Sequence, residues 1–173
     1  MSPSANRIIL DYCAGKLQQM ARRIEDCVRR LSDEQVWARG GENENAVGNL
    51  VLHLSGNVRQ WILSGVGGQA DIRKRNEEFD ARGGVPVGEL MERLNATVSD
   101  ATAVLQAVTP EQMMERRVIQ NYDVTVLEAI YHVVEHFSGH TGQIIFITKM
   151  LTGTDLGYYA HLRTTAPHGE KKP

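Results

Sequence analysis

The residues best suited to chemistry are three histidines spaced four residues apart, His132, His136 and His140, in the apolar segment YHVVEHFSGHTGQIIFITKM. In an α-helix this spacing places neighbouring side chains on nearly the same side, about 6 Å apart along the axis. Two imidazoles in that arrangement can bind one divalent cation. The outer two histidines are about 12 Å apart along the axis, so at most two of the three can bind the same ion.

A fourth histidine, His53, lies in a second apolar segment as part of a polar stripe. At about 100° per residue, Asn49, His53, Asn57 and Gln60 project from one side of a helix. Buried amides and imidazoles cost free energy unless they are hydrogen-bonded or coordinated. The stripe therefore indicates a shared polar cavity rather than plain core packing.

The segment with the three histidines has a matching stripe, which also includes Thr125 and Gln143. Two such stripes facing each other can enclose a cation, with His53 completing a set of three imidazoles and water in the remaining positions. Asn57, Gln143 and Glu135 are candidates for the hydrogen-bonding groups that orient the rings. The competing interpretation is that the histidines are hydrogen-bonded core residues and bind no ion.

Four stretches with helical periodicity must position these side chains, and no stretch has a strand signal. They cover residues 5–31, 46–63, 86–108 and 123–151, and Gly153 is expected to end the last one. The sequence therefore predicts an all-α four-helix bundle. Residues 64–85 are longer than most connections, which indicates a long crossover between helices 2 and 3 or a lid. Their charged run, residues 71–80, is interpreted as a solvated loop, with coverage of a substrate as the alternative.

Composition excludes several classes of protein. With 173 residues the chain is expected to form a single domain, residues 1–163, followed by a mobile tail, residues 164–173. Its 19 basic and 21 acidic residues give a net charge of −2, which disfavours nucleic-acid and anionic-membrane partners. No apolar run approaches the about 20 residues of a membrane span, and no secretory signal is evident, so a cytoplasmic location is expected. Cys13 and Cys27 would be about 21 Å apart on one helix, too far for a disulfide.

Two segments, AVGNLVLHLSGNVRQWI and HVVEHFSGHTGQI, resemble the half-sites of the DinB-like superfamily, the damage-inducible or YfiT-like group of metal-binding four-helix bundles. The resemblance covers roughly residues 5–159 and implies His53, His136 and His140 as metal ligands, with His132 outside the set. It also implies zinc or nickel as the metal and a homodimer as the assembly. Some members of that superfamily transfer low-molecular-weight thiols to electrophiles or use such a thiol to isomerise maleylpyruvate.

Several functions are compatible with such a site. The first is a metal-dependent thiol S-transferase that acts on small electrophiles, with a small-molecule thiol as the second substrate. A metal-dependent hydrolase needs a nearby general base, and no carboxylate falls clearly within the two polar stripes, which favours thiol transfer. The alternative from another class is a non-catalytic metal- or ligand-binding dimer.

Overall fold

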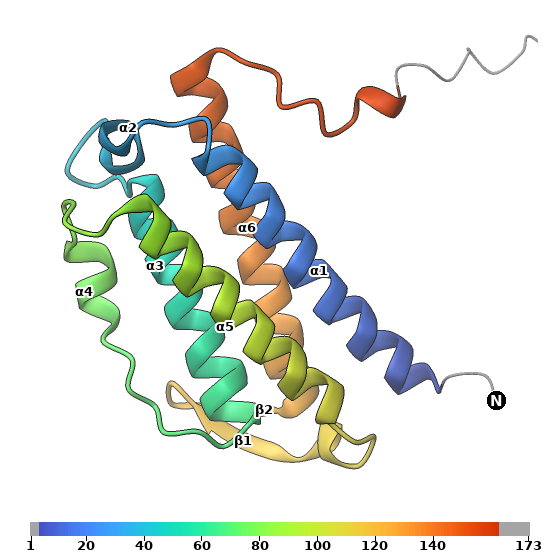
Figure 1. Ribbon diagram of the computed structural model, residues 1–173. Helices are drawn as coiled ribbons and strands as arrows, with labels where there is room; N and C mark the ends of the chain where they lie inside the picture. The colour runs from blue at the N-terminus through green and yellow to red at the C-terminus, as the bar shows by residue number, and fades with distance from the viewer. Residues whose placement is uncertain (1–3, 163–173) are drawn as a thin grey trace, which may run out of the picture.

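The computed structural model describes residues 4–162, which are mostly helical with one small two-stranded sheet (Figure 1). The longest helices are α1 (Ala5–Val28), α3 (Val47–Val58), α5 (Val87–Ala107) and α6 (Val126–Thr152). Shorter elements join them: α2 (Asp33–Trp37), the π-helix η1 (Arg59–Val66), α4 (Arg75–Asp80), the 3-10 turns η2 (Gln112–Met114) and η3 (Ala160–Leu162), and strands β1 (Arg116–Ile119) and β2 (Tyr122–Thr125).

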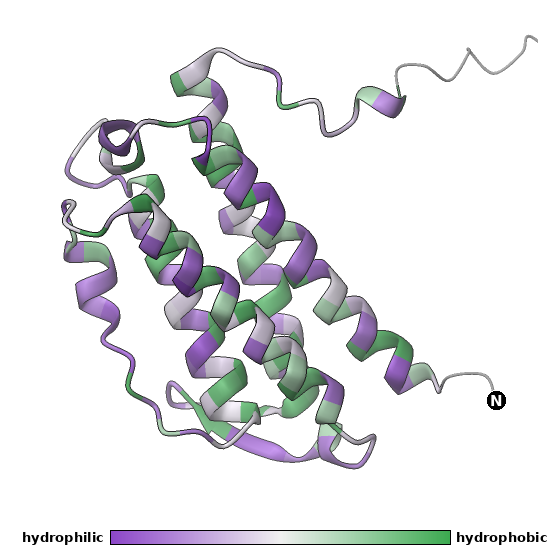
Figure 2. Ribbon diagram, in the orientation of Figure 1, coloured by the Kyte–Doolittle hydropathy of each residue, from purple (hydrophilic) through white to green (hydrophobic). Residues whose placement is uncertain are grey.

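The long helices pack around one apolar core. Helix α1 lies against α5 and α6, and α3 lies against the same two helices. The core between them contains fully buried side chains such as Leu17, Ile24, Leu54, Leu94 and Phe137. Hydrophobic positions recur along these helices, whereas the segment around α4 is predominantly hydrophilic (Figure 2).

Helices α3 and α5 are neighbours that run in the same direction (Figure 1). The chain between them must therefore return from one end of the helices to the other. It does so along the outside of α3, and α4 forms part of this return. We call residues 67–86 the crossover segment.

Helix α6, which carries the histidine series, has well-defined ends. Thr125 caps its start: the Thr125 hydroxyl accepts from the backbone N–H of Glu128, and the Glu128 side chain accepts in return from the backbone N–H of Thr125. At its other end, Gly153 adopts the left-handed conformation with φ 64°, as the sequence predicts. These caps fix the register in which His132, His136 and His140 face α3.

The prediction that the chain has no strand is wrong. Strands β1 and β2 form an antiparallel hairpin that pairs Ile119 with Tyr122. Its two turn residues, Gln120 and Asn121, both have positive φ, which is typical of the tight turns that match the twist of a hairpin. Ile119 is buried beside η1 and anchors the hairpin. As a result α6 begins at Val126 instead of residue 123.

The second predicted helix, residues 46–63, is one helical path with two parts: α3 continues directly into the π-helix η1. No helix of the described part of the chain is long and apolar enough to cross a membrane. The tail predicted for residues 164–173 lies outside the described residues.

Candidate metal centre

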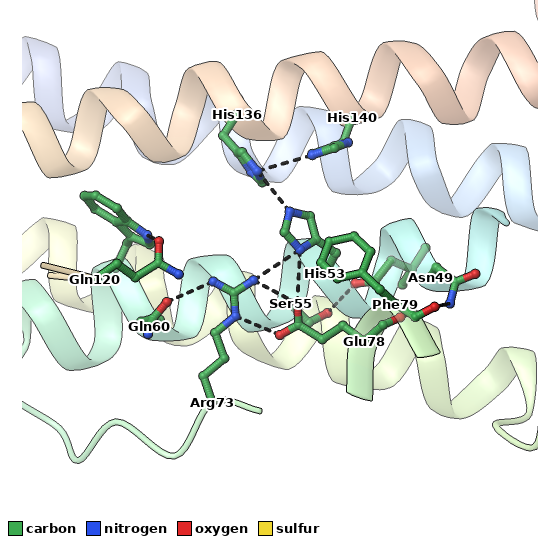
Figure 3. A network of polar contacts seen from close by, with 12 residues as sticks. Asn49, His53, Ser55, Gln60, Arg73, Glu78, Phe79, Gln120, His136 and His140 are labelled. Atoms are coloured by element: carbon green, nitrogen blue, oxygen red, sulfur yellow. Dashed lines mark hydrogen bonds and ion pairs between the residues drawn. The ribbon is translucent and has the colours of Figure 1, made fainter. Parts of the chain in front are cut away.

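Three imidazoles converge between α3 and α6 (Figure 3). Nε2 of His53 lies 3.0 Å from Nε2 of His136, which lies 3.2 Å from Nε2 of His140. The three candidate ligand atoms are all within 4.8 Å of one another. Two nitrogens bound to one tetrahedral zinc ion at about 2.1 Å are about 3.4 Å apart, so the cluster is close to the spacing that a metal requires.

Side-chain oxygens hold the Nδ1 atoms of His53 and His140. Nδ1 of His53 lies 3.0 Å from a Glu78 carboxylate oxygen, and Nδ1 of His140 lies 2.7 Å from Oε1 of Gln143. Because an ionised carboxylate and an amide oxygen only accept hydrogen bonds, both Nδ1 atoms must donate. This tautomer leaves the Nε2 lone pairs free for a cation, as in many metal sites. Nδ1 of His136 is buried without a partner among residues 4–162.

Arg73 completes the support of His53 (Figure 3). Its guanidinium makes a two-point ion pair with Glu78 at 2.7 and 2.8 Å and donates to Oε1 of Gln60 at 2.9 Å. The side chains of Arg73 and Glu78 are only 2% and 10% exposed. Arg73 Nη2 also lies 3.1 Å from Nδ1 of His53. Since the arginine can only donate, that contact is not a hydrogen bond when Nδ1 carries its proton.

The crossover segment therefore binds to the polar stripe of α3. Asn49 donates to the backbone oxygens of Glu78 and Ala81, both at 2.9 Å, and Gln60 donates to Asp71 at 2.7 Å. Most side chains of residues 71–80 are exposed, as the solvated-loop interpretation expects, but Arg75–Asp80 form a helix and Glu78 is buried against His53. Burial of the stripe favours this arrangement, since each buried amide or imidazole needs a partner.

A glycine permits this close approach. A Cβ built at Gly56 would collide with the Glu78 carboxylate and would lie 3.0 Å from Nε of Arg73. Gly56 is three residues after His53 on α3, so it is a near neighbour of His53 on the helix surface. Only a residue without a side chain lets the Arg73–Glu78 pair reach the ring of His53.

Burial sets the charge state of the cluster. It lowers the pKa of His136 to about 3, and the neighbouring His140 and His53 add to the effect. Burial also lowers the pKa of His140, against the opposing hydrogen bond to Gln143. For Glu78, burial alone would raise the pKa, but hydrogen bonds from Arg73 and His53 outweigh it and the pKa falls below its usual value. At neutral pH, neutral His136 and His140 thus lie close to an ionised carboxylate.

Two cavities open beside the three imidazoles. The larger, of about 960 Å³, extends toward the β-hairpin, and the smaller, of about 480 Å³, extends along α6 past His140. They share His132, Glu135 and His136. A metal held by the cluster would therefore be reachable from two sides.

The remaining predicted residues have other surroundings. His132 stacks on Trp61 with ring centroids 4.1 Å apart and does not join the converging nitrogens. The predicted orienting role of Asn57 and Glu135 has no support in the contacts: neither side chain hydrogen-bonds to any of the three imidazoles, although both line the larger cavity. Asn57 is one helical turn beyond His53 on α3.

With this geometry established, comparison with known proteins places the chain. A family model described as "Protein of unknown function (DUF1572)" matches residues 5–163. The chain belongs to this family. A crystal structure described as that of the conserved protein of locus from Enterococcus faecalis is similar to this DUF1572 member with a TM-score of 0.68. The two are 14% identical over 83% of this chain and 97% of that chain, which shows a shared fold alone. No curated protein matches the chain.

Sequence reasoning missed Glu78 and Arg73. The sequence predicts no carboxylate within the two polar stripes, but one reaches them from outside, because Glu78 of the crossover segment contacts His53. A signal was present: Phe79 is the one aromatic residue in the mostly charged run of residues 71–80, and its ring packs against the ring of His53 with centroids 4.6 Å apart. One aromatic residue in a charged connection indicates that this part of the connection is docked on the protein.

Proposed function

We propose that this protein binds one divalent metal ion through Nε2 of His53, His136 and His140 and transfers a small thiol to an electrophile beside that ion. The observation that carries the proposal is the convergence of three Nε2 atoms, two of them on rings fixed at Nδ1 by Glu78 and Gln143. Imidazole ligands suit zinc and nickel, which are the metals we expect. The resemblance to the DinB-like superfamily supports the same ligands, and it supports assigning α1, α3, α5 and α6 as a four-helix bundle.

The chemistry follows from the donor set. A divalent ion held by neutral imidazoles supplies Lewis acidity that lowers the pKa of a coordinated thiol or water. Glu78 and Gln143 keep the His53 and His140 rings in the ligating tautomer, and the two cavities give separate access for a thiol and an electrophile. The protein's own thiols are poor nucleophiles for this reaction, because Cys13 and Cys27 are both buried on α1.

Thiol transfer is favoured over hydrolysis by the state of Glu78. Its two carboxylate oxygens accept hydrogen bonds from Arg73 and His53, which hold its pKa below the usual value. A general base at neutral pH needs a raised pKa and a free oxygen, and Glu78 has neither. Attack by a coordinated thiol requires no such base.

Elemental analysis of untagged protein tests the metal site. We expect about one equivalent of zinc or nickel, its loss in His53→Ala with the helical circular dichroism unchanged, and its retention in the matched control His132→Ala. Absence of any divalent metal from the purified protein, together with no uptake on titration with zinc or nickel, would overturn the proposal.

Turnover tests the enzymatic part separately. A panel of small thiols is assayed with monobromobimane as the electrophile. We expect a rate that His53→Ala abolishes and that Glu77→Ala, at an exposed residue outside both cavities, retains. Metal binding without turnover for any thiol would leave a non-catalytic metal-binding protein. The homodimer and the cytoplasmic location implied earlier stay predictions, and light scattering of the purified protein measures the first.

A further inference from the structure

The larger cavity has walls that the metal site does not explain. Besides the histidines, six of its lining side chains are aromatic or aliphatic, and three of them are exposed: Tyr131 is 68% exposed, Tyr122 is 63% exposed and Ile9 is 41% exposed. Exposed apolar side chains gathered around one cavity indicate a ligand that covers them. Trp61 also lines the cavity but is only 3% exposed: the His132 ring packs against it with centroids 4.1 Å apart, and its Nε1 donates a hydrogen bond to Gln120 at 3.2 Å.

The backbone beneath this wall is unusual. Trp61 belongs to η1, an eight-residue π-helix. Such helices are rare and occur frequently at functional sites. The β-hairpin that the sequence did not predict closes the same end of the cavity, with the ring of Tyr122 6.3 Å from that of Trp61. A dedicated aromatic wall is thus built from two uncommon local structures.

Two polar groups of the cavity have neither a hydrogen-bond nor an ion-pair partner within residues 4–162. Asn57 is only 3% exposed, yet its amide makes no hydrogen bond within residues 4–162. A buried amide without a partner costs about 1–3 kcal/mol, so its retention needs a reason. Arg75 lines the cavity with its guanidinium 4.8 Å above the Phe79 ring, and it forms no ion pair in the described range.

The charges around the cavity give the ligand an orientation. Arg73 is fully engaged by Glu78 and Gln60, so Arg75 is the cavity cation that can receive an anion. Glu135 lies on the α6 wall and disfavours an anion there. An anionic group is therefore directed to the crossover side of the cavity, and an apolar body to the aromatic side.

From these observations we propose that the larger cavity binds a small aromatic carboxylate, with the ring against Trp61 and Tyr122, the carboxylate on Arg75 and a polar group within reach of Asn57. This deepens the proposed function, because it assigns the electrophilic substrate to an aromatic acid and leaves the smaller cavity to the thiol. Such an acid must also carry an electrophilic carbon, whose leaving group departs as an anion when the thiolate sulfur bonds to that carbon. His53 and His136 also line this cavity, but the ring and the carboxylate are assigned to Trp61, Tyr122 and Arg75, so the two proposals can fail separately.

Binding is measured in the full-length protein with Trp37→Phe, which leaves Trp61 as the only tryptophan of the two in the sequence. The probes are phenylacetate, its neutral analogue phenylacetamide, and acetate, followed by tryptophan fluorescence and calorimetry. We expect saturable binding of both ring compounds, phenylacetate about tenfold more tightly, and none of acetate. The titrations are repeated after a chelator has removed any bound metal. The order of affinities, phenylacetate before phenylacetamide before acetate, should stay the same whether or not elemental analysis finds a metal in the protein.

Substitutions at Arg75 and Asn57 test the roles of these two polar groups in binding. Arg75→Gln should remove the tenfold preference for phenylacetate, whereas the matched control Lys74→Gln, on the neighbouring residue paired with Glu77, should keep it. Asn57→Leu should weaken the binding of both ring compounds without lowering the melting temperature, because it removes a buried amide that has no hydrogen-bond partner among the described residues. No saturable signal with either ring compound, or a preference that survives Arg75→Gln, would overturn the assignment. So would a lower melting temperature in Asn57→Leu with binding retained.

Discussion

The carboxylate of Glu78 lies 3.0 Å from Nδ1 of His53, although the two residues are 25 positions apart in the sequence. This contact joins the crossover segment to the only candidate ligand on α3 among the described residues. The crossover segment is therefore part of the candidate metal site, and we expect its order and the metal affinity to depend on each other.

Removal of Glu78 should weaken metal binding. Glu78→Ala leaves Nδ1 of His53 without its acceptor, and we expect an affinity about 10–100-fold lower. The metal affinity of Glu78→Gln should lie between that of Glu78→Ala and that of the unsubstituted protein, because an amide oxygen can still accept the hydrogen bond. The measurement is competition with a chromophoric chelator, and Glu77→Ala, at an exposed neighbour on α4, serves as the control. Unchanged affinity in folded Glu78→Ala would show that the contact does not support the metal.

The Arg73–Glu78 pair should show strong non-additivity. Either Arg73→Met or Glu78→Met alone leaves a buried charge without its partner, which costs about 3–5 kcal/mol of unfolding free energy. The double variant should lose much less, because no unpaired charge remains. Urea unfolding of the metal-free protein gives the three free energies, and additive losses would contradict a coupled buried pair.

Gly56→Ala should damage the site through sterics alone. The new methyl group would collide with the Glu78 carboxylate, so we expect lower metal affinity and lower stability. Gly15→Ala is the matched control: Gly15 lies inside α1 with nothing near the position of a Cβ, so alanine there should stabilise by about 0.4–1 kcal/mol. Equal effects of the two substitutions on metal affinity would rule out the close approach at Gly56.

The metal-free protein should lose stability as the pH falls below about 6.5, the unperturbed pKa of histidine. Burial lowers the pKa of His136 to about 3 and also lowers that of His140. Between these folded-state values and the unfolded value, the unfolded chain binds more protons, so stability increases with pH and is fully present above about 6.5. Unfolding free energies measured from pH 4 to 8 test this. In His136→Gln the slope of unfolding free energy against pH should be lower by the equivalent of up to one bound proton.

The hydrophobic periodicity made the helices predictable. Positions such as Leu17, Ile24, Leu94 and Phe137 recur at helical spacing, and all four are buried where the long helices meet. Local caps were predictable for the same reason, as at Gly153, because they depend on residues within a few positions of each other. The hairpin was harder to predict: each strand has only four residues, and the turn is Gln120–Asn121 in place of the usual Asn-Gly.

The sequence by itself determined which face of each histidine-bearing helix is polar. The position of His53 on one helix, and of His136 and His140 on the other, fixes the direction in which each side chain leaves its helix axis. Only the tertiary structure decided what meets those faces. The positions of Arg73 and Glu78 depend on the path of a long connection, and Gly56 matters only because that connection lies against it. Such contacts arise from packing between segments far apart in the chain, which no local pattern encodes.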